Sequence, residues 1–89
     1  MKLSNEASRM YDVLRLNEAK RGITRTCLEI LFLDLELKEV SPEQIPFYKR
    51  MLLELQDLGY IKLYHENMNQ LKDLRRLKKK TAFKYEICK

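Results

Sequence analysis

The sequence predicts a single α+β domain over residues 1–89, mostly helical, with three helices followed by a C-terminal β-hairpin. Apolar residues recur with helical spacing over 7–14 and again over 48–58, whereas 81–88 alternates between apolar and polar side chains. Both prolines stand in one short stretch, 41–47, where a turn is expected. The chain is 45% hydrophobic with two Gly and two Pro, a composition that suits one modest core.

The first helix is predicted over residues 4–20. Ser4 suits the N-cap position, because its hydroxyl can accept a hydrogen bond from a backbone N–H of the first turn. Gly22, which follows Lys20 and Arg21, is expected to stop the helix, since Gly readily adopts the left-handed conformation of a helix end. Ile23 would then form a brief extended link.

The second helix is expected to start at a capping box, Thr26–Glu29, and to continue to about Glu36. Its residues are apolar almost all round, which is typical of a helix packed on two sides. Residues 33–40, however, alternate with period two, which is a strand signal. A helix with an extended exit is preferred, and a strand is the alternative.

The third helix is predicted to follow a turn through 41–45, to start at Pro46, and to run to Leu58 with Gly59 as its stop. Helical spacing places five apolar side chains on one stripe that should face the core. These are Tyr48, Met51, Leu52, Leu55 and Leu58.

Charges along this third helix are ordered against its macrodipole. Lys49 and Arg50 stand in its first two turns, and Glu54 and Asp57 stand in its last two. Each such charge costs an isolated helix roughly a few tenths of a kcal/mol. A negatively charged partner near the N-terminal turns would offset that cost.

Two strands are expected after Gly59, over 60–64 and 81–88, paired antiparallel with Phe83 and Tyr85 in the core. The connection between them, 65–80, has two interpretations. Asn67 could cap a short helix with Met68, Leu71, Leu74 and Leu77 on one side, or the connection could be a mobile, extended loop.

The net charge of +5 comes entirely from the second half of the chain. Residues 1–40 hold seven basic and seven acidic side chains, whereas residues 41–89 hold eleven basic and six acidic ones. Within 72–80, six cations accompany one acid. Such a run of like charges repels itself unless an anion is near, so the sequence indicates an anionic partner.

The stretch IPFYKRMLLELQDLGYIKLY, residues 45–64, resembles the winged-helix DNA-binding domain. A turn leads into a helix with Tyr48, Leu52 and Leu55 at the spacing typical of that superfamily, and Leu58–Gly59–Tyr60–Ile61 then opens the wing. The order of predicted elements fits the same domain. The apolar second helix, the long turn of about 37–45 and the long wing connection depart from the usual pattern.

This resemblance implies a small transcriptional regulator that binds double-stranded DNA. Helix 46–58 would enter the major groove, and a basic wing, 65–84, would lie on the phosphate backbone. The positions expected to read bases are Gln44, Phe47, Lys49 and Arg50. Those expected to contact phosphates are Lys72, Arg75, Arg76, Lys78, Lys79, Lys80 and Lys84.

Leu53 is an apolar residue on the polar side of the third helix. It would either cover residues 66–77 or contact a second copy, and the resemblance favours the second, because winged-helix regulators commonly form homodimers. The alternative function is a protein-interaction module, an inhibitor or adaptor with the same fold, whose basic segment docks on an acidic protein surface.

Other function classes find little support in the composition. One His and two Gly provide neither a nucleophile–base set nor a phosphate-cradling loop, so no enzyme activity and no cofactor are expected. Cys27 and Cys88 lack partners at metal-ligand spacing, and no small-molecule ligand is evident. The apolar runs are too short for a membrane span, and the first ten residues do not resemble a signal peptide, so a cytoplasmic or nucleoid-associated protein is expected.

Overall fold

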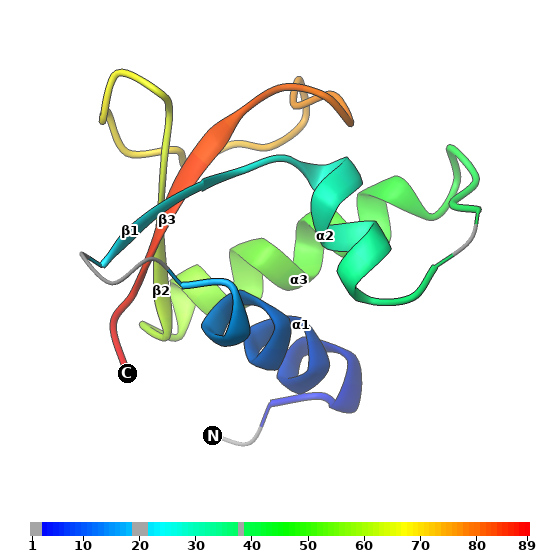
Figure 1. Ribbon diagram of the computed structural model, residues 1–89, viewed down its shortest axis with the longest axis horizontal. Helices are drawn as coiled ribbons and strands as arrows, with labels where there is room; N and C mark the ends of the chain where they lie inside the picture. The colour runs from blue at the N-terminus through cyan, green and yellow to red at the C-terminus, as the bar shows by residue number, and fades with distance from the viewer. Residues whose placement is uncertain (1–2, 19–21, 38) are drawn as a thin grey trace.

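The computed structural model describes residues 3–18, 22–37 and 39–89, which form three helices and a three-stranded antiparallel sheet (Figure 1). This arrangement confirms the predicted α+β class. The elements in chain order are α1 (Asn5–Leu16), β1 (Ile23–Thr26), α2 (Leu28–Asp34), α3 (Ile45–Asp57), β2 (Ile61–Tyr64) and β3 (Phe83–Ile87).

Helix α1 begins as predicted and ends four residues earlier than predicted. The hydroxyl of Ser4 accepts a hydrogen bond from the backbone N–H of Ala7 at 3.1 Å. At the other end, Asn17 donates both its backbone N–H and its side-chain amide to the carbonyl of Val13. Asn17 is the C-cap residue and the helix ends at Leu16, so the predicted end at residue 20 is wrong. Lys20 and Arg21 lie outside the described residues.

The sheet has the order β1-β3-β2, with both outer strands antiparallel to β3. The predicted hairpin is confirmed, with Leu63 opposite Tyr85. The expectation of a brief extended link at Ile23 is wrong, because residues 23–26 form a full third strand in which Thr24 lies opposite Tyr85. This strand has a single buried residue and so lacks the apolar alternation that would reveal it.

The predicted capping box at the start of α2 is wrong. Thr26 is the last residue of β1, and Cys27 occupies the N-cap position without a side-chain hydrogen bond to the helix. The backbone N–H of Glu29 instead donates to the carbonyl of Lys79 at 3.0 Å. A distant segment therefore satisfies a donor that the box was expected to satisfy.

Helix α2 ends at Asp34, slightly before the predicted end, and no strand follows among residues 33–37 and 39–40. Glu36 adopts a left-handed conformation with φ of 63°, and the N–H of Leu37 bonds the carbonyl of Phe32. Two-sided packing of this helix is also a wrong prediction, since Ile30 is 48% exposed and Leu33 66% exposed.

Helix α3 starts one residue before the predicted Pro46. The side-chain oxygen of Gln44 accepts from the backbone N–H of Ser41 at 3.0 Å, which holds the preceding turn. Gly59 ends the helix as predicted, with φ of +81°, and the N–H of Tyr60 bonds the carbonyl of Leu55. Any residue with a side chain would strain this left-handed position.

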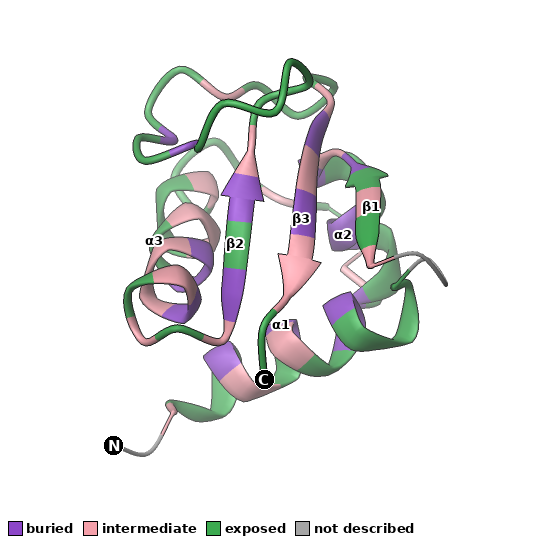
Figure 2. Cartoon of the chain, turned by 90° about the vertical axis from the view of Figure 1, so that its left-hand side faces the viewer, coloured by how far each residue is buried: buried purple, intermediate pink, exposed green. Residues whose placement is uncertain are grey.

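All three helices pack on one face of the sheet, where buried side chains from α1, α2, α3, β2 and β3 meet (Figure 2). The predicted stripe of α3 forms part of this core, with Tyr48 and Leu58 at its half-buried ends. The predicted core positions Phe83 and Tyr85 are fully buried. The largest fully buried side chains are Tyr85, Phe83, Met10, Leu14, Leu28, Leu31, Leu52, Leu55, Ile61, Leu63 and Leu74.

Tyr85→Phe should lower the free energy of unfolding by about 1–2 kcal/mol at pH 7, because the Tyr85 hydroxyl donates at 2.7 Å to the carbonyl of Leu14 at the end of α1. Burial raises the pKa of Tyr85 above its ordinary value. The folded state therefore keeps this proton longer than the unfolded state, and this contribution to stability falls as pH rises above about 10. Urea unfolding from pH 7 to pH 11 should show the deficit of the variant shrinking at high pH, and a constant deficit would contradict this assignment.

Candidate nucleic-acid interface

The residues that join β2 to β3, 65–82, are called the connecting segment below. The predicted short helix is wrong, because the segment forms a series of turns. The alternative of a loop is confirmed in this respect; the loop is anchored in the core, and its mobility stays a prediction. Leu71 and Leu74 are buried and Leu77 is half buried, whereas Met68 is exposed. The side chain of Asn67 accepts from the N–H of Asn69, which makes a local turn and not a helix cap.

Gln56 of α3 ties the connecting segment to the helix. Its side-chain oxygen accepts from the N–H of Leu63 at 2.8 Å, and its amide donates to the carbonyl of Leu71 at 3.0 Å. The N–H of Leu71 in turn bonds the carbonyl of Leu63. One side chain thus holds both β2 and the connecting segment against α3.

From Leu71 the segment runs back along α3, toward the start of the helix. Leu53 lines a groove together with Leu74, and Lys49 donates from Nζ to the carbonyl of Arg75 at 3.2 Å. Positions 49, 53 and 56 share one side of a helix because they are spaced by four and three residues. The connecting segment therefore covers this side of α3.

Leu53 is half buried and packs against the core cluster. The first of its two predicted roles, that of covering residues 66–77, fits this placement. Leu53 also lines the groove that Leu74 of the connecting segment lines. Its second predicted role, a contact with another copy, stays a prediction. Homodimer formation stays a prediction that rests on the resemblance alone.

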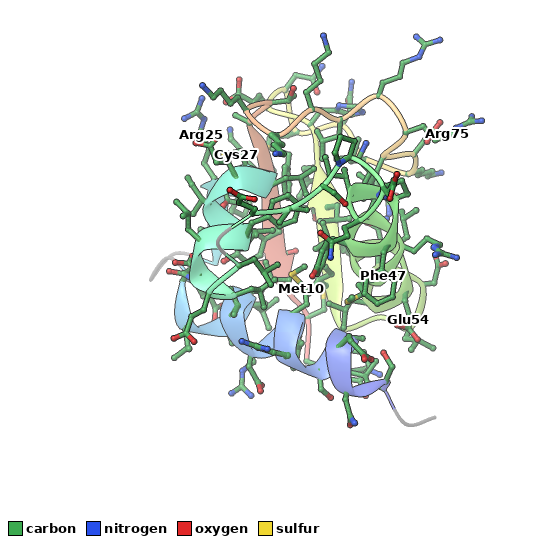
Figure 3. The ribbon with its side chains drawn as sticks, turned by 90° about the vertical axis from the view of Figure 1, so that its right-hand side faces the viewer. Met10, Arg25, Cys27, Phe47, Glu54 and Arg75 are labelled. Carbon is green, nitrogen blue, oxygen red and sulfur yellow. The ribbon has the colours of Figure 1, made fainter. Side chains whose placement is uncertain are left out.

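The four expected base-reading residues do not form one surface. Gln44 is held by Ser41 in the turn before α3, and Lys49 reaches across to the connecting segment. Phe47 is exposed beside Tyr48 (Figure 3), with ring centroids 5.4 Å apart, and Arg50 is exposed on the next turn. Gln44, Phe47 and Arg50 are exposed, whereas Lys49 is half buried, so three of the four members remain open to a partner.

A groove of about 250 Å³ lies where the connecting segment crosses α3. Its base is apolar, and three cations and one carboxylate stand around it. Such a combination suits a ligand with both a flat apolar surface and polar or anionic atoms. The lining residues are Pro46, Lys49, Arg50, Leu53, Asp73, Leu74 and Arg75.

The expected phosphate contacts divide into free and engaged side chains. Lys79 donates from Nζ to the carbonyl of Val40 at 3.4 Å, and Lys84 donates to the carbonyl of Glu66 at 3.1 Å. The side chain of Arg75 is paired with Asp73. The exposed members whose side chains make no hydrogen bond or ion pair within the described chain are Lys72, Arg76, Lys78 and Lys80.

The sequence analysis missed Arg25, which lies directly opposite Lys84 in the sheet. Its guanidinium forms an ion pair with Glu66 of the connecting segment. Tyr64 lies opposite Lys84 on the other neighbouring strand, and its hydroxyl donates to the Glu86 carboxylate at 3.2 Å. Burial raises the pKa of Tyr64, and the nearby Glu86 carboxylate raises this pKa further. The position of Arg25 beside Lys84 becomes apparent only once β1 is known to pair with β3 (Figure 3 labels Arg25 and Arg75).

No group of three or more His, Cys, Asp or Glu side chains in residues 3–18, 22–37 and 39–89 could hold a metal ion. Within the same ranges, no helix is long and apolar enough to cross a bilayer. No protein-family model, curated protein or solved structure matches the chain significantly.

Proposed function

We propose that this chain is a winged-helix domain that binds double-stranded DNA and acts in transcription regulation in the cytoplasm or on the nucleoid. The observation that carries the proposal is the convergence of Lys49, Arg50 and the basic connecting segment at one groove beside the first turns of α3. The order of elements, with the β1-β3-β2 sheet, also resembles the winged-helix arrangement.

In this proposal the DNA contacts are shared between α3 and the connecting segment. The first turns of α3 approach the major groove through Phe47 and Arg50, two of the predicted reading residues that are exposed, with exposed Gln44 in the turn before them. The exposed cations of the connecting segment neutralise phosphates. An approaching phosphate would also offset the reversed charge order of α3.

The salt dependence of binding tests this proposal. A protein that neutralises about five phosphates gives a slope of log K against log salt of roughly −4 to −5. Raising the salt concentration fourfold, from about 50 to about 200 mM, should therefore weaken binding to random duplex DNA roughly 250- to 1,000-fold. Fluorescence anisotropy with a labelled duplex measures this change. A slope near zero, or no binding at low salt, would rule out the proposed function.

We also infer, from the resemblance, that two copies act together on DNA. A symmetric dimer would contact half-sites about one helical turn apart, so the spacing of the preferred sites is measurable. Sedimentation equilibrium of the free protein and of its complex with a duplex decides between one copy and two.

A second candidate function is a protein-interaction module, and the exposed face of α2 favours it. Ile30 and Leu33 are both solvent-exposed on this helix, and residues 27–37 contain three acids and no cation. An exposed apolar face on a small domain is a common feature of interaction surfaces. Absence of DNA binding at low salt, with a protein partner lost on Leu33→Asp, would favour this function.

A further inference from the structure

Asp73 and Arg75 form a hydrogen-bonded pair at the groove beside α3. One carboxylate oxygen of Asp73 accepts from the backbone N–H of Arg75 at 2.9 Å, which closes a local turn. The guanidinium donates from Nε to both carboxylate oxygens, at 3.1 and 3.2 Å, and from Nη2 to one of them at 3.0 Å. Backbone and side chain of Arg75 are thus both fixed by the same residue.

This pair has little to do with the stability of the fold. The side chains of Arg75 and Asp73 are 88% and 55% exposed, and ion pairs in solvent contribute little. The pair instead determines how the guanidinium of Arg75 is oriented. Asp73 occupies the Nε–Nη2 edge, so the edge formed by Nη1 and Nη2 is left open to solvent, with no hydrogen bond among the described residues.

The free edge suits a base better than a phosphate. A phosphate bound there would lie close to the carboxylate of Asp73, and the two anions would repel each other. The pair is also neutral as a whole, so it adds little to the release of counterions from DNA. Guanine offers two neutral acceptors, O6 and N7, whose spacing matches two parallel N–H groups of arginine.

Arg75 lies beside the first turns of α3. Its carbonyl accepts from Lys49, and its side chain lines the same groove as Arg50. Both lysine and arginine belong to the first turns of α3, the part proposed to approach the major groove, where guanine presents O6 and N7.

We propose that Arg75 reads a guanine in the major groove and that Asp73 is its positioning residue. This inference rests on the proposed DNA binding, and it replaces the expectation that Arg75 serves the phosphate backbone. One cation fewer is then available to neutralise phosphates. In its place, one residue of the connecting segment contributes to the preference for a particular base sequence.

The first step of the test is to select preferred duplexes from a random pool with the wild-type protein. Replacing the preferred G·C pair should then weaken wild-type binding roughly 5- to 150-fold. Asp73→Asn keeps an oxygen for the turn but removes the charge and one acceptor for the guanidinium. It should lose most of that discrimination, while its affinity for random DNA stays equal or rises because an acid has been removed.

Two further variants separate positioning from charge. Arg75→Lys keeps the charge but not the two parallel donors, so it should keep the salt slope and lose the discrimination. Arg76→Ala should weaken binding to every sequence alike and keep the preference for G·C. The readout is the ratio of affinities for the two duplexes, measured at one salt concentration.

The outcomes distinguish the two proposals. Retained discrimination in both Asp73→Asn and Arg75→Lys, with salt-dependent DNA binding intact, would overturn the inference and leave the proposed function standing. A preference for A·T over G·C that depends on Arg75 would also overturn the reading of guanine. Absence of DNA binding by the wild-type protein would instead remove the proposed function itself.

Discussion

Replacing Lys78, Lys79 and Lys80 together with alanine is expected to weaken binding to all duplex sequences by roughly 3,000-fold at about 50 mM salt. Each lost phosphate contact makes the slope of log K against log salt less steep by about 0.9, so three bring it from roughly −4.5 to roughly −2. The estimate assumes that the salt-independent part of the affinity is unchanged. Anisotropy titrations at several salt concentrations measure both quantities.

Lys62→Ala provides the matched control, because this exposed lysine lies opposite Glu86 in the sheet and outside the connecting segment. It should leave the slope unchanged. Thermal unfolding checks that the triple variant stays folded; the three side chains are exposed, so little stability should be lost. An unchanged slope in the triple variant would show that these lysines do not contact phosphates.

Replacing Leu74 with alanine is expected to lower the free energy of unfolding by about 2–4 kcal/mol. Leu74 is 1% exposed although it lies in a segment without helix or strand, so its truncation removes apolar burial and leaves a cavity. For a small domain with a total stability of about 5–15 kcal/mol, this is a large fraction. Urea denaturation followed by circular dichroism measures the change.

Met68→Ala is the control for this prediction, since Met68 belongs to the same segment but is exposed, and its truncation should cost at most about 0.5 kcal/mol. Equal, small effects of the two variants would mean that the connecting segment does not pack against α3. The proposed positions of Arg75 and Asp73 would then lose their support, because Leu74 lies between them in the chain.

The candidate site could be predicted in its composition but not in its arrangement. The run of charges identified the cations, and helical spacing placed Lys49 and Arg50 outside the core stripe. The ion pair of Asp73 with Arg75 lies within three residues, yet the sequence did not reveal that the pair would stand beside Lys49. That proximity depends on Gln56 and Leu74, whose partners lie in other elements.

The sequence by itself determined the elements whose signals are local. Ser4 caps α1, Gly59 ends α3, and the alternation around Tyr85 makes a strand, because each of these effects acts within a few residues along the chain. The tertiary structure alone decided that residues 23–26 are a strand and that Lys79 satisfies the start of α2. Those hydrogen bonds join residues about fifty or more positions apart, and their partners become apparent only when the core brings them together.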